Sequence, residues 1–142
     1  MAVASGLLRL STGGDADIVN LTDGLASFLR SVEVADGVLT VFVTGSTAGV
    51  TTMEFEPGGV QDLREALERL LPVARPGGGE YAHNRLNHDD NAHSHLRASL
   101  VGPSLSVPLV RGRLVLGTWQ QVVLIDFDDR PRQRQVHLQL TY

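Results

Sequence analysis

The sequence contains no cysteine, no lysine and no long apolar run, and each absence excludes a class of chemistry or structure. Without cysteine there are no disulfides and no thiolate catalysis, and a bound metal would have only nitrogen and oxygen ligands. No segment approaches the roughly 20 apolar residues that a membrane helix needs. The N-terminus lacks the basic start and apolar stretch of a secretory signal. We therefore expect a cytoplasmic protein with no membrane partner.

The charge balance is acidic. The chain has 12 basic side chains, all of them arginine, against 16 acidic ones, and a net charge of −4. Nucleic-acid-binding domains usually carry a basic face, so no nucleic-acid partner is expected. Arginine binds phosphate in a bidentate fork, but a compositional bias of the genome explains the missing lysine as well. A length of 142 residues fits one domain spanning 1–142, with no room for a second core.

Hydrophobic periodicity predicts two main helices and several strands. Apolar residues recur at helical spacing from Leu21 to Leu29 and from Val60 to Leu71, and Pro72 ends the second run. Residues 73–91 are rich in Gly, Pro and Asn and are predicted to form a long loop, with a short helix at 92–101. Strands are predicted at 7–10, 38–44, 51–56, 105–110, 113–116, 120–127 and 133–140. Their partial segregation from the helices favours an α+β fold with a mixed, largely antiparallel sheet.

Four of the five histidines lie in the short polar stretch 80–95. They are His83, His88, His93 and His95, with acidic residues among them. Imidazole and carboxylate together bind zinc and also support proton transfer near neutral pH. On a helix His93 and His95 would diverge by about 200°, so we expect His95 to face the body of the protein and His93 to face solvent. Their spacing matches no closed metal motif, and a histidine-rich loop without function remains an alternative.

Two further polar segments could contribute to a site. Residues 89–91, Asp-Asp-Asn, could supply metal ligands, orient a histidine, or cap a helix. Residues 45–49, Gly-Ser-Thr-Ala-Gly, have the hydroxyls and glycines of an anion-binding nest, although a plain strand connection explains them at least as well. Glu54 interrupts an apolar strand, where a charge requires a partner or a role.

Several pieces of the chain together resemble a known family. The pieces are Gly45–Gly49 followed by Glu54, Tyr81-Ala82-His83, Asp89-Asp90-Asn91 leading to His95-Leu96, Leu100–Ser104, and Leu116-Gly117-Thr118-Trp119-Gln120. In this order and spacing they resemble the YjbQ-like family, also described as secondary thiamine-phosphate synthases. The resemblance covers nearly the whole chain, and Leu-Gly-Thr-Trp-Gln is its most specific piece.

The resemblance implies an α+β sandwich assembled as a homotrimer, with polar pockets near the subunit interfaces. It places the family's histidines at His83 and His95 and its acidic positions at Glu54 and Asp126. Many members have a histidine where this chain has Gly45. A site with three histidines would therefore need His88 or His93 as the substitute, or would have only two.

The first functional hypothesis is an enzyme that joins a pyrimidine diphosphate to a thiazole phosphate, as thiamine-phosphate synthases do. Its predicted catalytic residues are Glu54, His83, Asp90 and His95. A divalent cation, zinc or magnesium, is predicted at His83, His88, His93 and His95. A small phosphorylated molecule or inorganic anion is predicted at Ser46, Thr47, Arg97, Trp119 and Gln120.

Two residues of this set have an alternative role. Arg97 could bridge a phosphate to the loop at Ser46, or it could be a solvated helix residue. Trp119, the only tryptophan, would otherwise be expected in a core or at a subunit interface. The alternative functions are a non-catalytic metal- or anion-binding protein and a metal-assisted phosphate-ester hydrolase.

Overall fold

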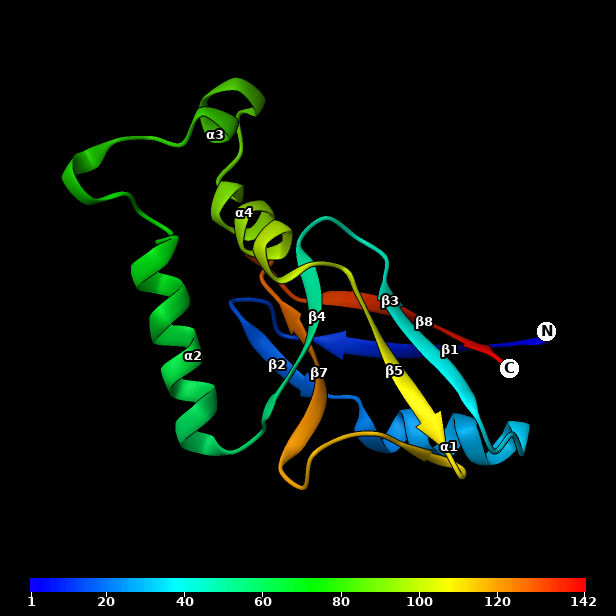
Figure 1. Cartoon of the computed structure of the whole chain (residues 1–142). Helices are drawn as coiled ribbons and strands as arrows, with labels where there is room; N and C mark the ends of the chain where they lie inside the picture. Colours follow the sequence, from blue (N-terminus) through cyan, green and yellow to red (C-terminus); the bar gives the residue numbers. More distant parts are fainter.

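The computed structural model describes residues 1–142 and folds them into two β-sheets packed face to face, with α1 at one end of the sheets and the other helices beside the smaller sheet (Figure 1). One sheet has five strands in the order β1-β8-β3-β5-β6, and the other has three in the order β2-β7-β4. Every strand pairing is antiparallel. The strands are β1 (Val3–Thr12), β2 (Asp17–Asn20), β3 (Gly37–Val43), β4 (Ala48–Glu54), β5 (Ser104–Val110), β6 (Arg113–Leu114), β7 (Gln120–Asp126) and β8 (Arg132–Thr141). The helices are α1 (Thr22–Val32), α2 (Pro57–Leu70), α3 (Ala82–Asn87) and α4 (Ala92–Val101), with a short 3-10 turn at Pro76–Gly78.

The main core lies between the two sheets and includes one face of α1. Strand β8 shows how the sequence builds it. Val136, Leu138 and Leu140 are buried, and the residues between them are exposed. Because β8 lies between β1 and β3, it supplies this inner face at the centre of the larger sheet. The alternation predicted for residues 133–140 is therefore confirmed.

A second core lies on the other face of the three-stranded sheet. It joins Ile125 and Phe127, at the end of β7, to Leu67 of α2 and Ala98 of α4. Figure 1 shows α2 and α4 beside β2, β7 and β4, away from the larger sheet. Strand β7 is thus covered on both faces. This explains why residues 122–127 are buried without interruption instead of alternating.

The predicted α+β class and the two main helices are confirmed, as α1 and α2. The short helix predicted at 92–101 is α4, with the same bounds. Two elements were not predicted. Strand β2 has four residues, too few for a clear pattern, and α3 lies inside the segment 73–91 that was predicted to be a loop. No helix of the chain is long and apolar enough to cross a membrane.

Candidate functional site

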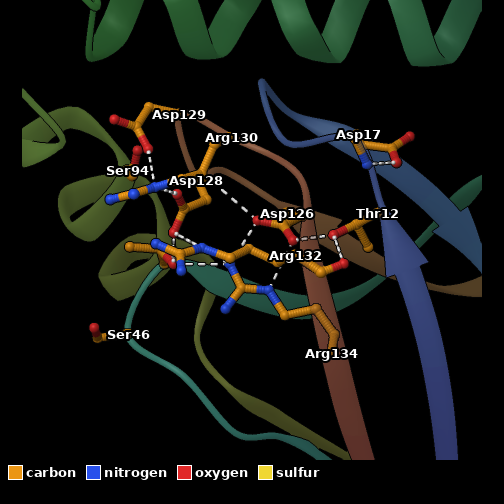
Figure 2. Close-up of polar contacts among 12 residues, drawn as sticks. Thr12, Asp17, Ser46, Ser94, Asp126, Asp128, Asp129, Arg130, Arg132 and Arg134 are labelled. Carbon is orange, nitrogen blue, oxygen red and sulfur yellow. Dashed lines mark hydrogen bonds and ion pairs between the residues drawn. The ribbon is translucent and has the colours of Figure 1, made fainter.

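The loop that follows β3 rests on a buried ion pair (Figure 2). Asp126 at the end of β7 has no exposed surface, and Arg134 on β8 is 7% exposed. Arg134 Nε donates to Asp126 Oδ2 at 2.7 Å, and its Nη2 donates to Oδ1 at 2.6 Å. The Thr12 hydroxyl also donates to Asp126. The two charges are paired in a bidentate fork, which is the arrangement that lets them stay ionised without water.

Thr47 connects this pair to a second carboxylate. Arg134 Nη2 donates to Thr47 Oγ1 at 2.8 Å, and Thr47 Oγ1 donates to Asp128 Oδ2 at 2.7 Å. Burial alone would raise the pKa of Asp128, but hydrogen bonds, led by that from Thr47, and the nearby Arg132 guanidinium hold this pKa well below its usual range. Arg132 Nε lies 3.0 Å from Asp128 Oδ2. Thr47 is therefore fixed by charged partners on two sides.

Gly45 brings the loop close to this network. Its φ is +127°, and a Cβ at this position would lie 2.8 Å from Arg134 Nη1. A side chain at residue 45 would therefore displace the buried guanidinium. The result is a tightly held turn that presents the Ser46 carbonyl oxygen to α4.

His95 binds that carbonyl. Its Nδ1 lies 3.1 Å from the Ser46 oxygen. A carbonyl oxygen can only accept, so Nδ1 carries the proton, and in the neutral ring Nε2 is left with a free lone pair. The buried network, the Ser46 turn and His95 thus form one continuous series of contacts that sets the orientation and tautomer of the ring.

His83 lies beside His95, with 4.7 Å between the ring centroids and 52° between the ring planes. It comes from α3. Its Nδ1 is 3.1 Å from Asn87 Nδ2, and its Nε2 is 3.3 Å from Asp89 Oδ1. The amide of Asn91 closes the group, 3.2 Å from the same Nε2. These contacts orient the ring from both nitrogens.

The two imidazoles face a cavity of about 330 Å³, lined also by Arg75, Tyr81 and Leu96. The Arg75 guanidinium stacks on the Tyr81 ring at 4.9 Å, and the Tyr81 hydroxyl donates to the Pro72 carbonyl at 2.7 Å. The cavity therefore combines a free imidazole nitrogen, a carboxylate-oriented imidazole and a guanidinium. These groups can transfer a proton and bind an anion.

The other two histidines of the cluster lie elsewhere. His93 was predicted to face solvent but is 4% exposed, on the inner side of α4. Its burial, followed by the charge of Arg97, lowers its pKa. His88 is exposed at the end of α3, in a left-handed conformation. The predicted shell of four histidines is therefore not assembled, and no group of three or more His, Asp or Glu residues could hold a metal ion.

Arg97 fits neither of its two predicted alternatives, a phosphate bridge to Ser46 or a solvated helix residue. It is 2% exposed, and its Nε and Nη2 donate to the Leu71 carbonyl at 2.9 and 2.7 Å. Nη2 also donates to Glu68 Oε2 at 2.6 Å. Arg97 thus satisfies a free carbonyl at the C-terminus of α2 and does not extend toward Ser46.

The remaining predicted residues are separated from the histidines. Glu54 pairs in register with Gln120 at the end of β4 opposite the Ser46 turn. A strand of this length measures about 20 Å, so Glu54 and the neighbouring Trp119 lie far from the cavity within one chain. Asp90 is exposed and does not line the cavity.

Sequence reasoning named Asp126 and Thr47 as site residues but missed Arg75 and the pairing of Asp126 and Thr47 with Arg134. The sequence contains a pattern that could have predicted the network. Acidic residues at 126 and 128 and arginines at 132 and 134 alternate with period two, as charges on the inner face of two strands would. No sequence pattern indicates Arg75, because a Gly- and Pro-rich segment without periodicity brings it to the cavity.

Comparison with known proteins gives one consistent result. Residues 7–142 match the family described as UPF0047 protein YjbQ-like. A UPF0047 protein of Archaeoglobus fulgidus is 39% identical over 91% of this chain and 94% of its own length. A crystal structure of a YbjQ-like protein of unknown function from Sulfolobus solfataricus has a TM-score of 0.89 at 28% identity, covering 98% of this chain and 96% of that one. A Clostridium acetobutylicum protein of the YjbQ/UPF0047 family gives 0.84 at 30% identity, covering 96% and 99%.

Proposed function

The chain belongs to the UPF0047 family of YjbQ-like proteins, as its motifs predicted, and from that premise we propose that it is an enzyme of the thiamine-phosphate synthase type. It would join a pyrimidine diphosphate to a thiazole phosphate in the cavity of His83 and His95. The observation that carries the proposal is the side-by-side placement of these two oriented imidazoles in one cavity with Arg75.

The reaction requires stabilisation of a leaving group. The thiazole nitrogen forms a bond to the methylene carbon of the pyrimidine, and the bond from that carbon to the diphosphate oxygen breaks. The electron pair leaves with pyrophosphate, so negative charge grows on the departing oxygen. Arg75 is positively charged at any working pH and can bind the diphosphate in a fork. Donors preorganised at this position lower the barrier because they need no reorganisation when the charge appears.

A metal would add to this charge. His95 Nε2 would supply one nitrogen ligand, and His83 a second only if a metal displaced the contacts of its Nε2 with Asp89 and Asn91. Two nitrogens are half of a tetrahedral zinc shell, whereas magnesium prefers oxygen. Zinc would therefore be the better match to these residues. When bound, it would supply positive charge next to the leaving diphosphate.

We further propose a homotrimer in the cytoplasm. Trp119 is 71% exposed, although tryptophan is a residue that interfaces bury. Glu54 and Gln120 lie beside it, far from the histidines of the same chain. Assembly would let this end of one chain meet the cavity of a neighbour.

Turnover tests the function. Purified protein, with and without zinc, is incubated with a pyrimidine diphosphate and a thiazole phosphate, and the condensed product and pyrophosphate are measured by chromatography. We expect product, and a loss of about tenfold or more in rate for His83→Gln and His95→Gln. His137→Gln, an exposed histidine on β8, is the matched control and should keep full activity.

Other outcomes would replace the proposal with one of its alternatives. Binding of pyrophosphate that depends on His83 and His95, without product, would indicate a non-catalytic anion-binding protein. Cleavage of a simple phosphate ester with zinc present would indicate a hydrolase.

A further inference from the structure

A cavity larger than the one at the histidines lies remote from them. It lies between α1 and the β5–β6 hairpin and has a volume of about 620 Å³. Figure 1 shows α1 beside the tip of β5, away from α3 and α4. Its apolar wall includes Leu29 and Ala26 of α1, Val34 after that helix, and Leu114 and Leu116 from the hairpin side. A volume of this size is ordinary for a small-molecule site, which typically measures roughly 300–1,000 Å³.

The rim of this cavity is positively charged. Arg30, Arg111 and Arg113 line it, and Glu33 is the only acidic lining residue. None of the three guanidinium groups is part of an ion pair within the chain. The one hydrogen bond among them joins Arg30 Nη2 to the Ser27 hydroxyl at 2.8 Å. A local excess of free arginine therefore faces an apolar wall, on a chain whose net charge is −4.

Arg111 stands where the backbone disfavours it. Val110 pairs with Arg113, so the hairpin loop is the dipeptide Arg111-Gly112, with φ of +51° and +74°. Positive φ at both positions is the type I′ turn, whose first position favours Asn, Asp or Gly. The Arg111 side chain makes no hydrogen bond or ion pair within the chain that would offset this conformation, as is typical of a residue retained for function.

The hairpin tip is anchored to the turn after α1. The Gly112 amide donates to the Ala35 carbonyl at 2.7 Å, and the Arg111 amide donates to Asp36 Oδ1 at 3.1 Å. These two bonds close one end of the cavity and fix the spacing of α1 and the hairpin. The arginine side chains are thus presented from a braced backbone, which lowers the entropy lost on binding.

We propose that this cavity binds an amphipathic anion, a molecule with an apolar body that lies against the leucines and a phosphate or carboxylate group that meets the free arginines. Apolar burial supplies part of the affinity, and the guanidinium forks select for charge. The site needs no residue of the His83–His95 cavity, so it stands independently of the function proposed there.

Four soluble probes separate these contributions: octyl phosphate, octanoate, 1-octanol and inorganic phosphate, each titrated into the full chain by calorimetry. We expect octyl phosphate and octanoate to bind, and octanol and inorganic phosphate to bind at least about tenfold more weakly. Equal binding of inorganic phosphate and octyl phosphate would overturn the proposal, because only surface charge would then be involved.

Arg111→Asn is the decisive variant. It removes the charge and also places a favoured residue in the type I′ turn, so we expect weaker binding of octyl phosphate by about tenfold together with a higher melting temperature. A variant that had merely lost its fold would bind less but would also melt at a lower temperature, so the two outcomes are distinguishable. The double variant Arg111→Gln/Arg113→Gln should weaken binding further, and Arg9→Gln on β1 is the control for net charge. Unchanged affinity in Arg111→Asn would refute the assignment.

Two further measurements distinguish other occupants. Sedimentation with vesicles containing phosphatidic acid tests a membrane source of the same chemistry. Binding to vesicles but not to octyl phosphate would contradict a small-molecule site. Self-association that Arg111→Asn abolishes, without binding of any probe, would show instead that this face contacts a second copy of the chain.

Discussion

His93 shows what a single buried imidazole does to the pH dependence of folding. Its Nδ1 is buried and has no hydrogen-bond partner, and burial, followed by the charge of Arg97, lowers its pKa from the ordinary value of 6.5. The folded state therefore binds this proton less readily than the unfolded state. The sign follows from linkage: the contribution of neutral His93 is complete above about pH 6.5 and is lost as the pH falls below it.

We expect the melting temperature of the wild type to fall between about pH 7 and pH 5 more steeply than that of His93→Gln, which cannot take up the proton. Asp128 does not complicate this window. Its pKa is held far below the usual range, so its own contribution is lost only at much lower pH. Thermal unfolding followed by circular dichroism measures both profiles. Parallel profiles for the two proteins would contradict the assignment to His93.

At the scale of single residues, the candidate site was predictable in part from the sequence. His83 and His95 were predicted as partners, and their rings lie 4.7 Å apart. Their chemistry is local, because both fall in one short stretch of sequence. Arg97 was not predictable, since its environment depends on how far α2 extends and where its last carbonyl lies. Residue type specifies what a side chain can bind, but tertiary packing decides which partner it meets.

Among the elements, α4 is held to α2 by the second core and by the bonds of Arg97 to the carbonyl at the end of that helix. In Arg97→Met the aliphatic stem remains, but the Leu71 carbonyl loses its partner. We expect a loss of about 1.5–3 kcal/mol in the free energy of unfolding, because hydrogen bonds from charged donors are worth this much. Urea denaturation measures it, and pyrophosphate binding at the histidine cavity should not change.

Arg69→Met is the matched control for this prediction. Arg69 lies on α2, the helix whose end Arg97 contacts, and its side chain is 72% exposed, with Glu65 at 3.8 Å. Surface ion pairs of this kind contribute about 0–1 kcal/mol, so the variant should remain close to wild type. If Arg97→Met kept its stability but lost anion binding, Arg97 would be a ligand residue after all.

Elements differ in how much of their structure is encoded locally. Strand β8 was predictable because its alternation is uninterrupted from Val136 to Leu140. Helix α3 was not, because its sequence is polar and its stability comes from outside it. Asn84 Oδ1 accepts from the Ala92 amide at 2.9 Å, a contact with the next helix that no local pattern reveals.

At the scale of the whole molecule, the proposed trimer makes a simple prediction. Sedimentation equilibrium at micromolar concentration should give three times the 15.3 kDa mass of the chain. Trp119→Ala should shift the protein toward smaller species, because an exposed aromatic side chain of this kind contributes strongly when an interface buries it. Leu86→Ala, an exposed apolar residue on α3, is a control for the loss of surface hydrophobicity. A stable 15.3 kDa monomer would contradict the assembly.

The position of β8 between β1 and β3 has a consequence for synthesis. A ribosome makes the chain from β1 onward, so both neighbours of β8 emerge well before it does. Until residues 132–141 leave the exit tunnel, β1 and β3 lack their shared partner, and the network around Asp126 lacks Arg134. The larger sheet can therefore close only after β8 has been made, and until then the nascent chain exposes the edges of β1 and β3 that β8 will pair, the state in which chaperones bind and misassembly begins.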